Sequence, residues 1–405
     1  MISAYFGLAV YLGPAVMLNA TIAVLIPLGL LLYAYLGYPG IMWLISRRHA
    51  WRPPKDDPEE WPEITIILPV YNEERVVAAT LDSLLALDYP ADKRHILVVS
   101  DASTDRTDEI VRSYEGRGIE LIRLSQRSGK TTAENTAAAR VHGSIIVNTD
   151  ATIRILPASL KALLRVFQDP DIGLASGRDV SVGDVHHEAN RGESGYVGYE
   201  MWLRSLESRV GSIVGASGCF FAIRRELFDV LFPSALSRDF ASALMAVDRG
   251  FRAVSVDDAI CLVPRAASLR TEYRRKVRTM TRGLETLWYK RGVATRSGFL
   301  FGFQLVSHKF LRWLFFLFTP LIPVGLGILA TRHAWALVAF ALLVLTSLLG
   351  GLAFLWPEDR RPPRILAFPG FLVGSVVAGF LAWIKAFRGE LNPIWEPTRR
   401  PNLAS

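Results

Sequence analysis

Four long runs without a charged side chain constrain the fold of this chain more than any other feature. Residues 1–46 contain no Asp, Glu, Lys, Arg or His, and further uncharged runs follow at 313–331, 334–357 and 365–384. A helix of about 20 apolar residues crosses the hydrocarbon core of a bilayer. Each run is long enough or nearly so, and the charges that flank them favour membrane helices over buried core helices. The sequence therefore predicts an α-helical transmembrane region at both ends.

The N-terminal run also indicates how the chain is oriented. It is too long for a cleavable signal peptide and lacks the basic start of one. Residues 21–46 form its best spanning segment, and residues 2–18, which contain Pro14, form a second short or re-entrant segment. Four basic residues follow between positions 47 and 55. Because basic loops favour the cytoplasmic side of a membrane, we expect the next domain to be cytoplasmic.

The charge and the cysteine content argue against two other classes of protein. The formal net charge is +8, but no RNA-binding motif or zinc-finger spacing accompanies it. We therefore expect a lipid bilayer as a partner, and no nucleic acid. The two cysteines, Cys219 and Cys261, give neither a metal-ligand spacing nor a disulfide framework, which fits a reducing cytoplasm.

Between its apolar ends the sequence alternates strands and helices. Strands are expected at 64–70, 95–100, 119–124 and 144–151, and helices at 72–87, 101–114 and 130–143. Repeated strand–helix units predict a mainly parallel, Rossmann-like sheet. Ligands of such sheets bind at the carboxyl ends of the strands. Asn72, Glu73, Asp101 and Asp150 follow three of the strands at these ends, so we expect a binding site there.

Six segments in this part carry a family resemblance by their order and spacing. They are ILPVYNEE (67–74), VVSDASTDRT (98–107), RSGKTTAEN (127–135), VNTDA (147–151), ASGCFFAIRRELF (216–228) and SRDFASALMAVDRGFRAV (237–254). HKFLRWL (308–314) and WEPTR (395–399) add to the set. Together they resemble membrane-embedded family-2 glycosyltransferases, the relatives of cellulose, chitin and hyaluronan synthases. The resemblance implies an α/β GT-A domain, a nucleotide-sugar donor, usually a UDP-sugar, and inversion at the anomeric carbon.

The resemblance also assigns residues to the donor site. It implies that Tyr71, Asn72, Glu73 and Asp101 line the nucleotide pocket, that Lys130 meets a phosphate, and that Gly218 belongs to the floor under the sugar. Each assignment has an alternative. Asn72, Glu73 and Asp101 could cap the helices that follow them, Lys130 could be a solvated surface lysine, and Gly218 could belong to an ordinary turn.

A divalent cation is the cofactor that the resemblance implies. Asp150 matches the first acid of the family's D-x-D motif, and Thr152 stands at the second. Mg²⁺ and Mn²⁺ prefer oxygen ligands, and such a cation would stabilise the leaving diphosphate as a Lewis acid. The Thr152 hydroxyl brings no charge, so we expect a weakened metal site at these two residues. In the alternative interpretation Asp150 only closes a strand.

Asp239 is the candidate catalytic residue. An alcohol acceptor is a poor nucleophile and needs a general base near the anomeric carbon. Asp239 matches the last acid of the family's T-E-D motif, and Arg238 replaces the acid before it. The alternative role for Asp239 is the N-cap of a helix that begins near Phe240.

The Q-x-x-R-W motif of processive family members is broken here. Its positions are occupied by Thr279, Arg282 and Gly283, so only the arginine is retained. Arg282 could bind the diphosphate through charge-assisted hydrogen bonds. The missing tryptophan removes a stacking platform for an acceptor sugar, which makes long-chain synthesis doubtful. The surrounding basic amphipathic segment predicts a helix at the membrane surface.

These observations divide the chain into six parts. We expect N-terminal transmembrane segments at 1–46, a linker at 47–62, the GT-A domain at 63–268, interface helices at 269–312, C-terminal transmembrane helices at 313–385 and a tail at 386–405. Segment 365–384 either spans the membrane or is re-entrant or interfacial, which leaves the side of the C-terminus open.

The predicted function is an inverting glycosyltransferase in a bacterial inner membrane, with its catalytic domain in the cytoplasm. It would move a sugar from a nucleotide-diphosphate donor to a lipid-linked or polysaccharide acceptor. The alternatives are a processive polysaccharide synthase and a degenerate membrane protein that only binds nucleotide sugars.

Overall fold

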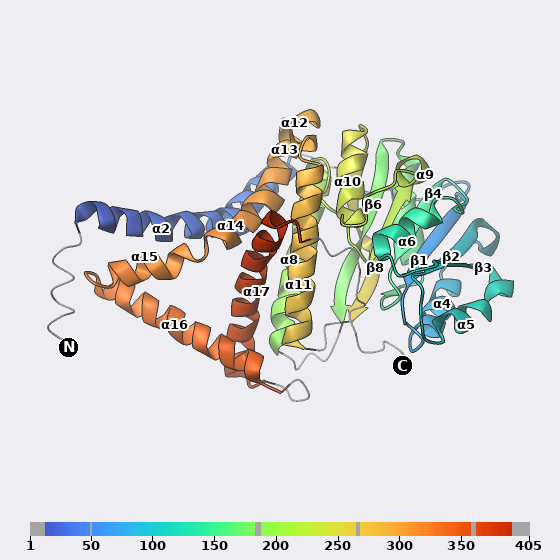
Figure 1. Ribbon diagram of the computed structural model, residues 1–405. Coiled ribbons are helices and arrows are strands. Elements are labelled where there is room, and N and C mark those ends of the chain that lie inside the picture. Colours follow the sequence, from blue (N-terminus) through green and yellow to red (C-terminus); the bar gives the residue numbers. More distant parts are fainter. Residues whose placement is uncertain (1–12, 49–50, 183–187, 265–267, 358–361, 391–405) are drawn as a thin grey trace.

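A computed structural model describes residues 13–48, 51–182, 188–264, 268–357 and 362–390, without the side chains of 188–194 (Figure 1). Residues 2–12 of the expected short segment at 2–18, and the WEPTR sequence in the tail, lie outside these residues.

The described chain is organised around one eight-stranded sheet. Its strand order is β3-β2-β1-β4-β7-β6-β8-β5. The strands are β1 (Ile64–Val70), β2 (Arg94–Ser100), β3 (Ile119–Arg123), β4 (Ile145–Thr149), β5 (Arg154–Ile155), β6 (Ile172–Val182), β7 (Phe220–Arg224) and β8 (Arg252–Pro264). β1 pairs in parallel with β2 and β4, and β2 with β3. This half confirms the predicted α/β domain, whereas β7 runs antiparallel to β4 and β6 and makes the whole sheet mixed.

Helices cover both faces of the sheet. They are α4 (Val77–Leu85), α5 (Thr107–Arg112), α6 (Lys130–Ala137), α7 (Ser159–Arg165), α8 (Glu188–Val210), α9 (Arg225–Phe228) and α10 (Arg238–Asp248), with short 3₁₀ turns at Ala91–Lys93, Glu115–Arg117 and Val166–Gln168. Alternate residues of β1 point to opposite faces. Ile66 therefore packs in one core with Leu81 of α4, and Ile67 in the other with Ala133 of α6.

Two of these helices differ from the expected ranges. α4 begins at Val77 and α5 at Thr107, about five residues later than the sequence pattern predicts. The intervening residues form turns in which Asn72 has φ 52° and Ala102 has φ 58°. A left-handed backbone is strained for non-glycine residues, and such residues cluster at functional sites. The delayed helix starts thus leave room for two turns at the strand ends.

The remaining elements of the described residues are helices. These elements are α2 (Pro14–Leu32), η1 (Tyr33–Gly37), α3 (Tyr38–Ser46), α11 (Leu269–Tyr289), α12 (Val293–Arg296), α13 (Phe299–Leu305), η5 (Val306–Leu311), α14 (Arg312–Phe318), α15 (Leu321–Leu329), α16 (Ala334–Leu355) and α17 (Arg364–Phe387). Pro14–Ser46, α16 and α17 are each long and apolar enough to cross a membrane, and Phe299–Phe318 with α15 forms a further candidate that bends by 51°. α2, α15 and α16 extend away from the sheet domain on one side (Figure 1).

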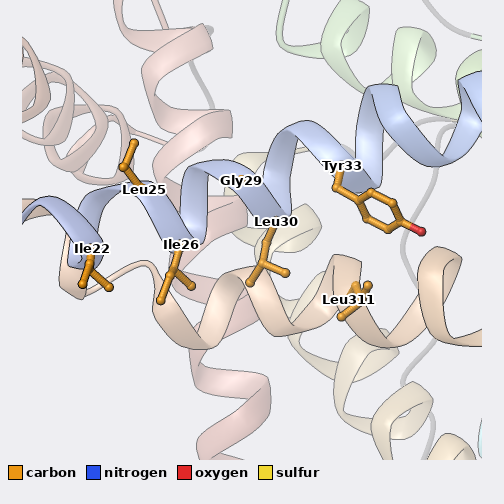
Figure 2. A pocket seen from close by; sticks show the side chains of 7 residues that line it. All are labelled: Ile22, Leu25, Ile26, Gly29, Leu30, Tyr33 and Leu311. Carbon is orange, nitrogen blue, oxygen red and sulfur yellow. The ribbon is translucent and has the colours of Figure 1, made fainter.

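An apolar groove lies on this helical side. It has a volume of about 450 Å³ and is lined by one face of α2 together with Leu311 of η5. Figure 2 shows Ile22, Ile26 and Leu30 pointing from α2 toward the neighbouring helix. Large apolar side chains such as Leu25 remain exposed there. Exposed apolar surface of this kind is typical of a face that contacts a membrane or another protein.

Candidate active site

The turns after β1 and β2 are locked to each other. The Asn72 Oδ1 atom accepts a hydrogen bond from the Thr104 amide at 2.7 Å, and the Asn72 amide donates to Ser103 Oγ at 3.1 Å. The Glu73 amide donates to Thr107 Oγ1 at 2.8 Å. Asn72 and Glu73 therefore stand at the edge where the sequence places them, but they join two loops instead of capping α4.

Asp101 ties a third loop to this edge. Its side chain is buried and accepts hydrogen bonds from the Ser128 amide at 2.6 Å and the Gly129 amide at 2.9 Å. Gly129 has φ 90° and directly precedes α6. Asp101 thus holds the start of α6, and the alternative that it caps α5 is wrong. Beside it, the Arg127 guanidinium lies 4.0 Å from the centre of the Tyr71 ring, so Tyr71 borders the same loop.

Lys130 lies between Asp150 and Gly218, two other predicted site residues. Its Nζ atom is 2.5 Å from Asp150 Oδ1 and donates to the Gly218 carbonyl at 3.0 Å. Burial alone would lower the pKa of Lys130, but the carboxylates of Asp150 and Glu134 outweigh it and raise the pKa above its usual value. The alternative of a solvated surface lysine is wrong, because 18% of this side chain is exposed. One fixed ammonium thus joins α6, the end of β4 and the loop before β7.

The residues around Asp150 fit a cation that arrives with a substrate. Among the described residues no three His, Cys, Asp or Glu side chains are grouped to hold a metal by themselves. Mg²⁺, however, is commonly bound by one or two carboxylates together with substrate phosphates. Asp150 directly follows β4, and its carboxylate would supply one such oxygen ligand; Thr152, the other predicted ligand, lies two residues further along the chain. A cation held jointly with a diphosphate would compete with Lys130 for Asp150.

Asp239 faces the Gly215–Gly218 stretch, which we name the acceptor loop. It lies in the first turn of α10, where Ser237 takes the N-cap position. Its Oδ1 atom accepts a 2.5 Å hydrogen bond from Ser237 Oγ. A Cβ atom added to Gly218 would lie 2.9 Å from Asp239 Oδ2, so glycine is needed for this approach. One carboxylate oxygen is thus held by Ser237 while the other faces the loop.

Arg238 points away from this carboxylate. Its guanidinium bonds Asn135 Oδ1 and the Phe228 carbonyl and stacks on the Phe228 ring. Glu134 is a site residue that the sequence reading missed. It is buried on α6, 4.0 Å from Lys130 Nζ, and burial raises its pKa above the usual value against the opposing effect of Lys130. The i,i+4 spacing of Lys130 and Glu134 was the available signal.

Arg282 reaches the site from α11. Its guanidinium donates to Thr131 Oγ1 at 2.8 Å and to the Leu236 carbonyl. Burial lowers its pKa from the usual value, and the charges of Asp239 and Glu134 oppose this effect. The retained arginine of the broken motif is therefore anchored to α6 and to the segment before α10.

Gly283, which replaces the tryptophan of the motif, lies against another tryptophan. A Cβ atom at Gly283 would lie 2.6 Å from Cη2 of Trp313 on α14. The Trp313 ring also packs edge-to-face on Phe240, the neighbour of Asp239, with ring centres 6.1 Å apart. α11, α14 and α10 are thus joined by one aromatic contact directly behind the candidate base.

Comparison with known proteins assigns this part of the chain. The model of the family described as "Glycosyl transferase family 2" matches residues 65–232. This segment is a glycosyl transferase family 2 domain. It contains β1 to β7 and, of the candidate residues, all except Asp239 and Arg282.

The chain spans about half or less of the length of the curated relatives that it matches. An N-acetylglucosaminyltransferase of Rhizobium sp. (strain N33) is 27% identical over 226 residues, which cover 50% of this chain and 48% of the relative. A beta-monoglucosyldiacylglycerol synthase of Synechocystis sp. is 24% identical over 175 residues, which cover 42% of this chain and 36% of the relative.

A solved structure extends the likeness to the helical part. A mannosyltransferase from Pyrobaculum calidifontis, in complex with GDP-Man and Mn²⁺, superposes with a TM-score of 0.68 at 23% sequence identity. The match covers 90% of this chain and 99% of that one. The family 2 domain and the helices that follow it therefore occur together in another protein with the same overall fold.

Proposed function

We propose that this chain is a membrane-bound inverting glycosyltransferase that transfers a single sugar from a nucleotide-diphosphate sugar to a lipid-linked or saccharide acceptor. One observation carries the proposal. The Lys130 ammonium bridges Asp150 and the Gly218 carbonyl, and Asp239 Oδ2 lies 2.9 Å from the position that a Cβ atom of Gly218 would take. The Lys130 ammonium, which would bind the diphosphate, and the Asp239 carboxylate, which would deprotonate the acceptor hydroxyl, thus lie at the same loop.

Asp239 acts as the general base. Ser237 fixes its Oδ1 atom, and Oδ2 faces the acceptor loop. A hydroxyl placed between Oδ2 and the anomeric carbon would lose its proton to the carboxylate as the new glycosidic bond forms. The base would work on the face of the sugar opposite the leaving diphosphate, which inverts the configuration.

The donor is held by the three loops at the strand ends. Tyr71, Asn72, Glu73 and Asp101 surround the nucleotide, of which UDP is the form that the family resemblance favours. Lys130 and Arg282 neutralise the diphosphate through charge-assisted hydrogen bonds. A divalent cation bound at Asp150, with Thr152 beside it, would supply Lewis acidity to the leaving group when bound.

The acceptor side favours a membrane substrate and a single addition. The chain has helices that are long and apolar enough to cross a bilayer, and one of them, the bent Phe299–Leu329 segment, contributes Trp313 beside the site. One relative is named a beta-monoglucosyldiacylglycerol synthase. Trp313 packs on Gly283 and Phe240. The ring is thereby engaged inside the protein, which does not favour its use as a stacking platform for a growing polymer.

The Asp239→Asn variant tests the proposal. It keeps the shape of the side chain but cannot accept the proton, so we expect a loss of transfer of at least about 100-fold with unchanged donor binding. Asp248→Asn, at the other end of α10, is the matched control and should retain activity. Nucleotide release from a panel of nucleotide sugars, with product masses, measures turnover and product length.

The outcomes separate the alternatives. Retained turnover in Asp239→Asn removes Asp239 from the role of base. Products longer than one added sugar favour a processive synthase. Nucleotide-sugar binding without hydrolysis or transfer in the wild-type protein favours a degenerate binding protein.

A further inference from the structure

A buried group of charged side chains lies outside the donor site. It joins α8 to the helix formed by η5 and α14. We name it the α8–η5 cluster, and its members are Glu200, Arg204, Glu207, His308, Lys309 and Arg312. His308 carries 0% exposed side-chain area, and its ring nitrogens lie 2.9 Å from Glu200 and 2.6 Å from Glu207. Three of its members, His308, Lys309 and Arg312, belong to the HKFLRWL segment, to which the family resemblance assigns no role.

Two cations of the cluster contact the acceptor loop. Arg204 Nη2 donates to the carbonyl of Ala216 at 3.3 Å. A Cβ atom added to Gly215 would lie 3.6 Å from Lys309 Cε and 4.0 Å from Lys309 Nζ. The opposite end of the loop, at Gly218, contacts Asp239. The loop thus separates the candidate base from a pair of cations.

The carboxylates of the cluster do not balance its cations. Glu207 is engaged by His308 and by the Tyr38 hydroxyl at 2.5 Å. Glu200 is therefore shared by three cations, with Arg312 at 2.7 Å, Lys309 at 3.3 Å and Arg204 at 4.0 Å. Arg204, Lys309 and Arg312 thus outnumber the carboxylates Glu200 and Glu207, so at least one positive charge is left over beside the acceptor loop whether or not His308 is protonated. A buried unpaired charge is costly.

Among the described residues, Arg204 is one cation of the cluster whose hydrogen-bond donors are not all paired. Its side chain is 10% exposed. In the described part of the chain its Nε and Nη1 atoms have no hydrogen-bond acceptor. Lys309 keeps 15% of its side chain exposed, close to the 18% of Lys130 in the donor site. Two buried donor groups that lack an acceptor within the described structure, and a partly exposed ammonium, therefore lie beside the acceptor loop.

We propose that Arg204 and Lys309 form an anion-binding subsite that holds a phosphate group of the acceptor. This inference rests on the proposed function, because it names the chemistry of the acceptor. Gly215 and Gly218 have Cα atoms at most about 10 Å apart, so the subsite and the candidate base flank one short loop. The substrate class is an alcohol that also carries a phosphate, as in a phospholipid or a lipid-linked saccharide.

Binding of simple probes tests the subsite without knowledge of the acceptor. Dodecyl phosphate, dodecanol and inorganic phosphate are titrated into the full-length protein in a nonionic detergent, with UDP and Mg²⁺ present to fill the donor site. The variants are Lys309→Met, which removes the charge but keeps the length, and Lys309→Arg, which keeps the charge. Lys385→Met is the matched control, since Lys385 is an exposed lysine of α17 on the same helical part.

We expect wild type, Lys309→Arg and Lys385→Met to bind dodecyl phosphate and not dodecanol. Lys309→Met should bind it about tenfold more weakly, or worse, because a charge-assisted hydrogen bond is lost. UDP affinity and the unfolding temperature should stay close to those of wild type, which separates the subsite from folding and from the donor site.

Two results overturn the inference. One is equal affinity of wild type and Lys309→Met for dodecyl phosphate, and the other is no binding of any phosphate by wild type. If inorganic phosphate binds in a Lys309-dependent way but dodecyl phosphate does not, the anion is free and its assignment to a lipid acceptor is wrong. Donor hydrolysis is measured in parallel, so its failure counts against the proposed function alone.

Discussion

Lys130 and a donor-bound cation would compete for the Asp150 carboxylate, and this competition can be tested by mutation. Lys130 Nζ already lies 2.5 Å from this carboxylate, and a donor-bound cation would need the same oxygens. Asp150→Asn should raise the cation concentration for half-maximal turnover by about tenfold, since a charged ligand is lost. Lys130→Met should lower that concentration while it lowers the maximal rate. Turnover across a Mg²⁺ and Mn²⁺ titration measures both effects, and an unchanged cation dependence in Asp150→Asn contradicts a metal role.

Glu134 predicts how stability depends on pH. Burial raises its pKa above 4.5, so the native state holds the proton to a higher pH than the unfolded state does. The contribution of this group to stability is therefore present below about pH 4.5 and is lost as the pH rises through the raised pKa. Glu134→Gln cannot ionise. The unfolding temperature of the variant, relative to that of wild type, should therefore increase as the pH rises from 4 to 7.5. A constant difference between the two proteins would contradict the raised pKa.

At the residue scale the sequence predicts positions better than contacts. Asn72, Asp101 and Asp150 could be placed at one edge because parallel strands end together there. Their partners could not be predicted, because Asp101 bonds amides 27 and 28 residues further along the chain. The direction of Arg238, toward Asn135 and away from Asp239, depends on the packing of α9 against α10. Contacts of this kind arise from tertiary structure and leave no local pattern.

At the scale of elements, the contact between Gly283 and Trp313 couples α11 to α14. In Gly283→Ala the new methyl group would overlap the Trp313 ring, and the ring packs on Phe240 beside Asp239. We expect a destabilisation of about 1–3 kcal/mol from overpacking and a lower turnover. Gly351→Ala on α16 is the control, because a Cβ atom there meets nothing within 4 Å. Thermal unfolding and turnover of both variants check this, and equal behaviour would contradict the coupling.

The bounds of the helices and strands show which elements the sequence pattern predicts accurately and which it does not. β1 was predicted with its observed bounds because it is apolar and fully buried. α6 ends at Ala137, six residues before the expected end at Gly143. The apolar stripe of α11 was predicted, but we expected it to lie on a lipid surface. The structure covers Leu284 and Met280 of this stripe with Ala382 and Trp383 of α17, a tertiary contact that amphipathicity alone cannot distinguish from a membrane contact.

At the scale of the whole molecule, the position of α17 bears on the topology that the sequence left open. α17 runs alongside α11, whereas α2, α15 and α16 extend away from the sheet domain (Figure 1). Of its most apolar window 39% is buried, compared with 17% for Pro14–Ser46 and 11% for α16. Lys276 Nζ lies 2.6 Å from Ser375 Oγ, near the middle of α17. A spanning α17 would place this ammonium at the centre of the bilayer, at a cost of about 3 kcal/mol or more.

An interfacial α17 predicts on which side of the membrane the turn before α16 and the end of α17 lie. Three crossings, by Pro14–Ser46, by the bent Phe299–Leu329 segment and by α16, leave the turn before α16 outside and the end of α17 in the cytoplasm. In a background with Cys219 and Cys261 replaced by Ala, Thr331→Cys should react with an impermeant maleimide on intact cells. Arg388→Cys should react only after permeabilisation, and the cysteine-free background should not react. Labelling of Arg388→Cys from outside would show that α17 crosses the membrane, and protection of Thr331→Cys would show that the predicted orientation is wrong.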